Sequence, residues 1–512
     1  MLSKVLSYGL LGIEAFPVEI EIDVRRGLPS INFVGLPDQA TKESKDRIKC
    51  AINNCGFHFP PDRITINLAP ADIHKSGPGF DLAIALGILA SSAQISKESL
   101  KDFVFLGELS LDGALRPIKG ILPIVMALRA QAGFPKQIIL PKSNSYEAAV
   151  IEEIDAFGFT DLKQVINFLY ERDASVPATK LNMQETIEDA PYPFDFQEVK
   201  GQNLAKRALE IAAGGAHNII MIGPPGSGKS MLAKRLPGII PNMTLEESLE
   251  TTRIHSSLGA VPGKAGLIKK RPFYAPHHTI SDVALVGGSQ IPQPGEISLA
   301  HNGVLFLDEL PEFRRNVLEA LRQPLEEGKI RISRIQKSSN FPAKFMLVAA
   351  MNPCPCGYYT DPHKQCRCNT TKIEKYLSRI SGPLLDRIDI HIEVPAIKYK
   401  DLTSESPAEP SSLIKQRVAK ARRIQQERFK NEGIFTNAHM TTRQIKKYCL
   451  LSKDSSSLLK CAIEELGFSA RAYDKILKVG RTIADLAESE NILTEHISEA
   501  IQYRSLDRRI WA

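Results

Sequence analysis

The stretch that decides the fold is Gly223-Pro224-Pro225-Gly226-Ser227-Gly228-Lys229-Ser230. It follows an apolar run at 219–222 and precedes a segment, 231–236, whose composition suits a helix. In this context the pattern G-x-x-x-x-G-K-[ST] cradles phosphates, because glycines let backbone N–H groups approach the oxygens and the helix N-terminus attracts anions. Lys229 would reach the β- and γ-phosphates, and the Ser230 hydroxyl would ligate Mg²⁺. The stretch predicts a site for a nucleoside triphosphate, with ATP and Mg²⁺ as cofactors.

The second half of such a site lies downstream, where the apolar run 304–307 ends in Asp308 and Glu309. Asp308 would hold the Mg²⁺ shell, and Glu309 would orient and activate the attacking water. Two acids after an apolar run are common at strand ends. The pair therefore indicates a catalytic site only in combination with the glycine loop. Together the two elements favour hydrolysis over binding alone.

Length and composition predict about three domains, since the chain has 512 residues of which 43% are hydrophobic. Stretches rich in proline and polar residues interrupt it at 173–193 and around 402–412. We therefore expect an N-terminal α/β or α+β domain at 1–172, a linker at 173–193, an α/β nucleotide domain at 194–400 and a helical domain at 401–512. Four helices are expected in the last part, at 412–431, 442–449, 456–466 and 470–488.

Charge and hydropathy limit the partners and the cellular location that we expect. A net charge of +7 permits a polyanionic partner without requiring one. No apolar run approaches the roughly 20 residues that a membrane helix needs, and residues 2–16 lack the pattern of a signal peptide. We expect a cytoplasmic protein with no membrane partner, in which the eight cysteines are thiols or metal ligands rather than disulfides.

Four of these cysteines form two C-x-C pairs, Cys354 with Cys356 and Cys366 with Cys368, and His363 lies between the pairs. Tetrahedral zinc takes four soft ligands, which so short a loop could supply, although zinc pairs are usually separated by two or more residues. A structural Zn²⁺ is the favoured interpretation, and free thiols are the alternative. The other cysteines are expected to be packing residues.

Three further motifs surround the nucleotide elements: Gly201-Gln202, the run 294–303 before the acidic pair, and the segment 352–357. With the separate N-terminal domain, they resemble the ComM/YifB branch of the magnesium-chelatase-type AAA+ ATPases. This resemblance implies an AAA+ core, a C-terminal helical lid, and ring-shaped, usually hexameric motors with ATP sites between subunits. ComM-type members are DNA helicases that promote branch migration when incoming strands recombine during natural transformation.

The resemblance therefore implies an ATPase coupled to DNA translocation. Its expected partners are single-stranded and branched DNA and further copies of the chain, with recombination proteins as further candidates. A metal-insertion chaperone of the magnesium-chelatase type is the alternative, weakened because those motor subunits lack this N-terminal domain and this chain has no D-x-S-x-S motif. An ATP-dependent protease is a third possibility.

Three residues take roles from the family by position. Asn352 ends the apolar run 345–351 and matches sensor 1, where a polar side chain helps to position the hydrolytic water. Arg387 matches the arginine finger that reaches the γ-phosphate of a neighbouring subunit. Arg471 matches sensor 2 on the lid. For both arginines a surface ion pair is the alternative interpretation.

Two segments between these motifs resemble insertions of the same clade. Residues 271–278 and 286–289 resemble the helix-2 insertion, in which His277 and His278 have either a structural role, which is favoured, or form a metal pair. Residues 328–340 alternate in strand period around a polar turn and resemble the hairpin before sensor 1. Its cations would track DNA phosphates without reading sequence, unless the hairpin is merely exposed and charged; they are Lys329, Arg331, Arg334 and Lys337.

The N-terminal domain resembles the proteolytic domain of Lon-type proteases, through motifs at 67–70, 77–81, 107–108 and 116–120. Matching the motifs puts Gly79 where the nucleophilic serine belongs and Leu122 where the activating lysine belongs. Neither side chain can attack a carbonyl or accept a proton. The domain is expected to be a catalytically dead scaffold for oligomerisation or DNA engagement. A dyad of Ser76 with Lys75 or Lys119 is the alternative.

Overall fold

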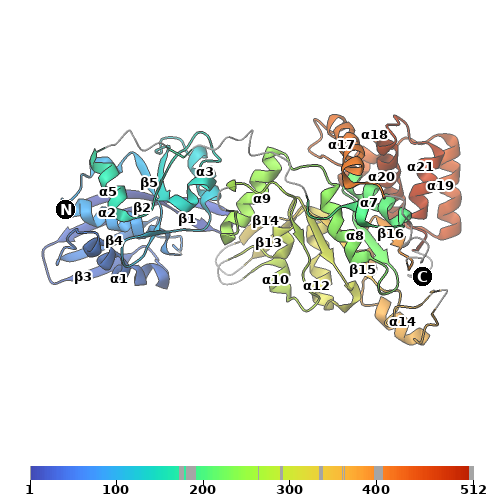
Figure 1. The fold of residues 1–512 in the computed structure, drawn as a ribbon, viewed down its shortest axis with the longest axis horizontal. Helices are drawn as coiled ribbons and strands as arrows, with labels where there is room; N and C mark the ends of the chain where they lie inside the picture. The colour runs from blue at the N-terminus through green and yellow to red at the C-terminus, as the bar shows by residue number, and fades with distance from the viewer. Residues whose placement is uncertain are drawn as a thin grey trace.

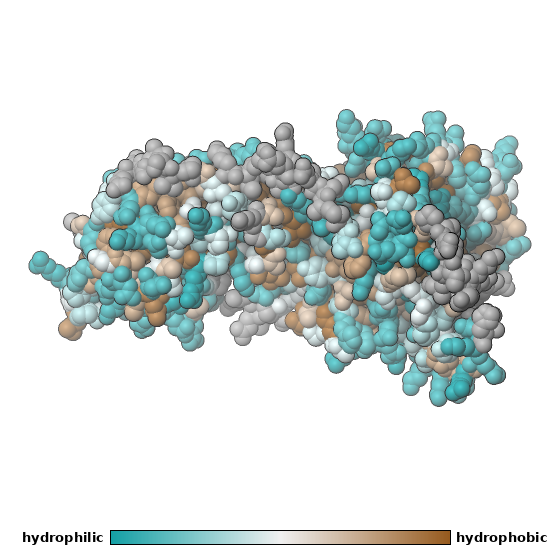
Figure 2. Space-filling view, viewed as in Figure 1, coloured by the Kyte–Doolittle hydropathy of each residue, from teal (hydrophilic) through white to brown (hydrophobic). Residues whose placement is uncertain are grey.

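The computed structural model describes residues 2–75, 77–171, 178–179, 192–262, 265–288, 292–333, 338–359, 361, 364–396 and 408–506. Figure 1 shows three parts in a row: an N-terminal domain, a central domain built on a second sheet, and a helical domain at the far end. Within the described ranges, no helix is both long and apolar enough to cross a membrane. Figure 2 shows hydrophilic side chains over most of the visible face of the helical domain.

The N-terminal domain is built on a seven-stranded sheet in the order β3-β4-β2-β1-β5-β8-β9. Its strands are β1 (Leu2–Leu11), β2 (Glu14–Arg25), β3 (Ser30–Val34), β4 (Arg63–Ala69), β5 (Phe103–Phe105), β8 (Gln137–Pro141) and β9 (Asp155–Phe159). The pairs β1–β2 and β2–β4 are antiparallel and the others are parallel. This mixed architecture agrees with the α/β or α+β prediction, while the likeness to Lon proteases stays a prediction.

Helices pack against this sheet, and the most buried of them is α2 (Asp81–Ser91). Every residue of α2 is buried, because alanine, leucine and isoleucine surround the whole helix. The other helices are α1 (Gln39–Asn54), α3 (Ile121–Ala130), α4 (Ser145–Ala148) and α5 (Leu162–Glu171), and a small hairpin joins β6 (Glu108–Leu109) to β7 (Leu115–Arg116).

The central domain is built on a five-stranded sheet in the order β11-β12-β15-β10-β16, in which all the strand pairs are parallel. Its strands are β11 (Phe273–Tyr274), β12 (Val304–Leu307), β15 (Met346–Met351), β10 (Ile219–Ile222) and β16 (Ile390–Glu393). Every residue of β10, β12 and β15 is buried, as expected for parallel strands covered on both faces. The carboxyl ends of these strands meet at one edge, where ligands of open α/β sheets bind.

The helices and the hairpin of this domain surround the sheet. The helices are α7 (Asn203–Gly215), α8 (Lys229–Arg235), α9 (Leu245–Leu258), α10 (Asp282–Val286), α11 (Glu296–Leu299), α12 (Arg315–Ala320), α13 (Arg322–Glu327), α14 (Thr370–Leu377) and α15 (Gly382–Leu385). A separate antiparallel hairpin joins β13 (Lys329–Ser333) to β14 (Ser338–Pro342), where the alternating sequence predicts one.

The helical domain contains α17 (Ser411–Arg428), α18 (Thr442–Tyr448), α19 (Lys453–Leu466), α20 (Ala470–Leu486) and α21 (Thr494–Gln502). Helices α17 to α20 occupy the four segments predicted to be helical. Buried residues of α7, β10, α17 and α20 belong to one continuous core, so this domain packs firmly on the central one. Buried hydrogen bonds of His217 also join these two domains. Its Nδ1 bonds Asp389 of the central domain (2.9 Å), and its Nε2 bonds Thr482 of the helical domain (2.8 Å).

The N-terminal domain docks on α9 and on strand β14 of the hairpin (Figure 1). The Gly120 N–H donates to the Ser256 carbonyl (2.8 Å), and Arg253 Nε donates to the Ile13 carbonyl (2.9 Å). Each domain also inserts an apolar side chain into the other. Ile13 of the N-terminal domain packs in a core of the central domain, and Leu267 of the central domain packs in a core of the N-terminal domain. The first two domains therefore meet through both polar and apolar contacts.

Candidate nucleotide site

The glycine loop connects β10 to α8, which begins at Lys229. Gly226 and Gly228 have φ angles of 78° and 90°, which residues with a Cβ rarely adopt. A Cβ on Gly223 would lie 2.1 Å from the Val394 carbonyl oxygen, so this position has no room for a side chain. The predicted motif residue Gln202 also contacts the loop, with Nε2 3.3 Å from the Ser227 carbonyl oxygen. The loop thus has the strand–turn–helix setting that its sequence predicts.

Lys229 lies over the glycine loop with its ammonium group close to Asn352. Its Nζ donates to the carbonyl oxygens of Gly223 (2.8 Å) and Pro224 (2.9 Å) and lies 3.3 Å from Asn352 Oδ1. Burial lowers the pKa of the Lys229 ammonium, and the nearby Asp308 carboxylate opposes this effect. The structure therefore brings Asn352, assigned from the family resemblance alone, to the lysine that the motif predicts.

Ser230 and Asp308 meet across the sheet edge, where Ser230 Oγ donates to Asp308 Oδ2 at 2.5 Å. They come from the first turn of α8 and from the end of β12, and β12 is separated from β10 by β15. A hydroxyl and a carboxylate are hard oxygen ligands of the kind that Mg²⁺ prefers. The pair fits the predicted Mg²⁺ site, and its residues would hold the ion.

Glu309 follows Asp308 in a left-handed backbone conformation, with a φ of 53°. Its carboxylate is about half exposed, and Oε2 lies 3.3 Å from His278 Nδ1. The His277 ring stacks beside His278 with 4.1 Å between ring centroids, and Phe313 meets His278 edge-on. Within the described ranges, only the four cysteines form a group of three or more candidate metal ligands. The structural role of the two histidines stays a prediction.

We call Lys229, Ser230, Asp308, Glu309 and Asn352 the nucleotide cluster. Sequence reasoning missed the contact that His278 makes with it. The contact could have been predicted by recognising the strand β11 in the sequence. Because β11 pairs in parallel with β12, the loop with His278 and the loop with Glu309 emerge at the same edge of the sheet. Because β11 is only two residues long, its pattern in the sequence is weak.

The two predicted arginines lie together in a second group, which we call the arginine cluster: Arg387, Arg471, Asp386 and Glu326. Arg387 pairs with Glu326 and donates through Nη1 to the Pro383 carbonyl (2.6 Å), while Arg471 Nη1 lies 3.2 Å from Asp386 Oδ2. Among the described residues, the hydrogen bonds and ion pairs of both guanidinium groups stay within this cluster and Pro383. The structure thus pairs the two arginines with Glu326 and Asp386, and not with residues of the nucleotide cluster.

The β13–β14 hairpin presents Lys329 and Arg331 to solvent while Ile330 and Ile332 are buried. This alternation is the expected consequence of side chains pointing to opposite faces of a strand. The other two predicted DNA contacts, Arg334 and Lys337, lie outside the described residues.

The four cysteines of the two C-x-C pairs come together, with their sulfur atoms all within 4.8 Å of one another. Cys354 is buried and the other three are partly buried. The cluster could hold a zinc ion, as its sequence predicts. His363, which lies between the pairs, falls outside the described residues.

In the N-terminal domain, the residues at the two positions matched to the catalytic residues of Lon proteases make packing contacts. Leu122 is fully buried, and its backbone N–H donates to Glu147 Oε1 at 3.0 Å. A Cβ on Gly79 would lie 3.7 Å from Ile118 Cδ1, in ordinary contact. Of the alternative dyad, Lys75 is fully buried, Lys119 packs beside Gly259 of the central domain, and Ser76 lies outside the described residues. The inactivity of this domain therefore stays a prediction, as does the alternative dyad.

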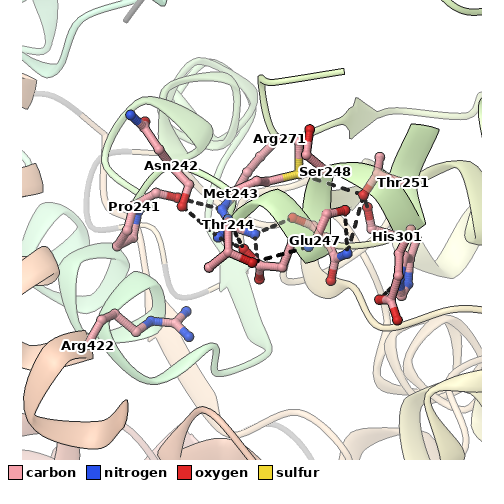
Figure 3. A network of polar contacts seen from close by, with 12 residues as sticks. Pro241, Asn242, Met243, Thr244, Glu247, Ser248, Thr251, Arg271, His301 and Arg422 are labelled. Atoms are coloured by element: carbon pink, nitrogen blue, oxygen red, sulfur yellow. Dashed lines mark hydrogen bonds and ion pairs between the residues drawn. The ribbon is translucent and has the colours of Figure 1, made fainter. Parts of the chain in front are cut away.

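A polar network that sequence reasoning did not anticipate secures the start of α9 (Figure 3). Arg271 donates to the carbonyl oxygens of Pro241 and Asn302 (both 2.6 Å) and pairs with Glu247 (2.9 Å). Arg422 of α17 lies beside this network; burial and the charge of Arg271 lower its pKa to about 9. Because Asn302 lies two residues before the start of β12, the network connects α9, on which the N-terminal domain docks, to the strand that ends just before Asp308.

Comparisons with known proteins agree with this geometry. Residues 195–402 match the family described as magnesium chelatase, subunit ChlI. Residues 20–144 match the subunit ChlI of Mg-chelatase, and residues 408–504 match the C-terminal part of subunit ChlI.

Individual relatives match along nearly the whole chain. The chain is 44% identical to Competence protein ComM of Haemophilus influenzae over 99% of its own length and 98% of the relative's. It is 42% identical to YifB of Escherichia coli (strain K12), with 99% and 98% covered. The magnesium-chelatase 67 kDa subunit of Chlorobaculum parvum is 29% identical over only 31% of this chain and 23% of that protein. With its complete nucleotide cluster and these full-length matches, the chain belongs to the ComM/YifB family of magnesium-chelatase-like proteins.

Proposed function

We propose that this protein is an ATPase that uses ATP hydrolysis to move along DNA and to drive branch migration during recombination of incoming DNA in natural transformation. The observation that carries the proposal is the joining of Lys229, Ser230, Asp308 and Asn352 at one edge of a parallel sheet. Full-length similarity to a protein named for competence supports the DNA-related part.

The chemistry at this edge divides among the side chains. Lys229 would neutralise the β- and γ-phosphates, and Asn352 beside it would help to place the attacking water. Mg²⁺, when held by Ser230 and Asp308, would neutralise charge on the phosphate oxygens. Glu309 would accept the proton of the water, and His278 would hold the Glu309 carboxylate in position until nucleotide binds.

Completion of the site requires a second chain in this proposal. Arg387 and Arg471 pair with Glu326 and Asp386 rather than with the nucleotide cluster. We propose that assembly into a ring, a hexamer by the family resemblance, brings Arg387 to the γ-phosphate of the neighbouring subunit. Hydrolysis would then depend on assembly, as it does where an arginine finger acts in trans.

DNA would pass the β13–β14 hairpin. Exposed Lys329 and Arg331 offer charge to phosphates without reading bases, which suits a motor that must work on any sequence. Strand β14 of the hairpin also contacts the N-terminal domain: a Cβ on Gly12 would lie 3.2 Å from Phe341 Cζ. The N-terminal domain would thus be a scaffold joined directly to the DNA-contacting element, with recombination proteins as further candidate partners.

The second candidate is an ATP-driven metal-insertion chaperone, favoured by the names of the matching family models. Against it, the likeness to the 67 kDa magnesium-chelatase subunit covers 31% of this chain. That share is too small to carry over a porphyrin-loading partner.

ATP hydrolysis by the full-length chain distinguishes the two candidates. It should be measured without DNA, with single strands and with a four-way junction, and Lys229→Ala provides the blank. Stimulation by DNA, greatest with the junction, supports the motor and should be accompanied by junction unwinding. Hydrolysis that is indifferent to every DNA contradicts the motor and favours the chaperone.

A further inference from the structure

The cysteine cluster has the size of a tetrahedral metal site. The Sγ atoms of Cys354, Cys356 and Cys366 are separated by 3.3, 3.5 and 3.7 Å. Four thiolates around zinc, each about 2.3 Å from the ion, place the sulfurs about 3.8 Å apart. Disulfide sulfurs lie only about 2.05 Å apart, and all four cysteines are free. The sulfurs therefore already stand near the corners of a zinc tetrahedron without any bond between them.

Backbone geometry supports the same arrangement. The Cys368 N–H donates to Cys366 Sγ at 3.4 Å, and the Gly357 N–H turns back to the Cys354 carbonyl at 2.9 Å. Gly357 has a φ of 84°, so the chain bends sharply just after the first C-x-C pair. Such a turn lets the short C-x-C spacing direct both sulfurs to one point.

The loop that carries the cluster packs directly on the glycine loop. A Cβ on Gly357 would lie 2.4 Å from Pro225 Cδ and 2.7 Å from Pro225 Cγ, so the two loops touch without room for a methyl group. Pro225 is the third residue of the phosphate-binding motif. If Cys354 and Cys356 moved, Gly357 would therefore press on the glycine loop or separate from it.

Both ends of the cysteine loop also reach Asn352. Cys354 follows Asn352 by two residues, and Cys368 directly precedes Asn369, whose side chain caps α14. The backbone N–H of Asn352 faces the Tyr376 hydroxyl on α14 and partly offsets the rise that burial causes in the pKa of that hydroxyl. The cysteine loop thus starts two residues after Asn352, which lies 3.3 Å from Lys229, and leads into α14, which carries Tyr376.

We propose that the four cysteines bind one Zn²⁺ ion and that this ion fixes Asn352 and the glycine loop for nucleotide binding. The second half of this proposal rests on the proposed function, because it takes the glycine loop to be the ATP site. The role goes beyond local folding. The ion supports the nucleotide cluster through two contacts: Gly357 packs against Pro225, and Tyr376 contacts the backbone of Asn352.

The first experiment measures bound metal. Full-length protein purified from zinc-supplemented cells should carry about one zinc per chain by elemental mass spectrometry. Cobalt substitution should give the intense absorption of a tetrahedral thiolate site. Cys366→Ser should lose the metal, whereas the control Cys461→Ser, at an exposed position on α19, should keep it. Wild type without zinc, or Cys366→Ser that retains it, would overturn the proposal.

The second experiment measures the Kd of a fluorescent ATP analogue without DNA. Removing zinc from wild type with a chelator should raise the Kd on the order of tenfold, and adding Zn²⁺ should restore it. This reversible arm does not depend on whether Cys366→Ser folds. An unchanged Kd in zinc-free protein would overturn the coupling.

Gly357→Ala separates the packing contact from the metal. It should keep its zinc but raise the Kd of the analogue, because the methyl group collides with Pro225. Gly433→Ala is the matched control: its φ is 68°, but its Cβ would meet no atom within 4 Å. Equal Kd values for the two variants would contradict the contact. Lys229→Ala binding the analogue as well as wild type would instead refute the ATP site itself and leave the zinc measurement standing.

Discussion

The nucleotide cluster and the arginine cluster differ in what holds their charged groups. Lys229 contacts Asn352 and Ser230 contacts Asp308, because these residues follow neighbouring strands at one edge of the sheet. Arg387 and Arg471 instead pair with carboxylates, Glu326 and Asp386. The first cluster is arranged to receive phosphates, whereas the second is neutralised within its own chain. In our proposal, one chain therefore suffices to bind the nucleotide, whereas hydrolysis needs two chains.

Lys229→Ala should have the largest effect, because it removes the charge that faces the phosphates. We expect ATP affinity to fall by about 100-fold or more and hydrolysis to fall to the rate measured without protein. Equilibrium binding of an ATP analogue and phosphate release measure the two effects. Lys234→Ala, at an exposed position of the same helix, should behave as wild type. Normal nucleotide affinity in Lys229→Ala would mean that the glycine loop is not the site.

Arg387→Ala should leave nucleotide affinity unchanged and lower turnover by about 10³-fold or more, as expected for an arginine finger. Steady-state hydrolysis at saturating ATP measures this, together with sedimentation to confirm that assembly persists. Arg379→Ala is the control, since Arg379 lies in the same segment and forms an exposed pair with Glu312. A turnover loss shared by both variants would reduce Arg387 to a surface ion pair.

Glu309→Gln should bind ATP normally but turn it over about 10²–10⁴ times more slowly, because an amide cannot accept the proton of the water. Single-turnover hydrolysis measures the chemical step apart from product release. Glu312→Gln, three residues further along and exposed, serves as the control. Unimpaired turnover in Glu309→Gln would remove this residue from the mechanism.

Asp389→Asn should have the smallest effect on turnover and act mainly on stability. Burial alone would raise the pKa of Asp389, but Lys475 and His217 hold it below its ordinary range. A depressed pKa stabilises the fold above the unfolded value of about 4, and this stability is lost as the pH falls through the folded value. The variant should therefore lose about 3 kcal/mol at pH 7 and differ less from wild type below about pH 4.

Calorimetric unfolding at several pH values tests this prediction, with Asp454→Asn as the control at an exposed position. A stability difference that stays constant from pH 7 to pH 3 would show that Asp389 does not titrate as argued.

The sequence predicts the parts of the site that depend on local patterns. The glycine loop, the strand ending in Asp308 and the alternating hairpin are each read within about ten residues. Asn352, Arg387 and Arg471 came from family resemblance, because a lone polar residue carries no periodic signal. The contacts of Arg387 with Glu326 and of Gly357 with Pro225 join segments that no local pattern relates. Both contacts needed the three-dimensional structure, and the first of them distinguishes the arginine cluster from the nucleotide cluster.

The most direct test of the shared site mixes two inactive variants. Lys229→Ala lacks a working nucleotide cluster but still carries Arg387, and Arg387→Ala has the opposite defect. Hydrolysis should be measured with a four-way junction for each variant alone and for the mixture. We predict that the mixture hydrolyses ATP well above the sum of the two, because each Arg387→Ala site can receive a finger from a Lys229→Ala neighbour. A mixture no faster than that sum would contradict the claim that two chains complete one site.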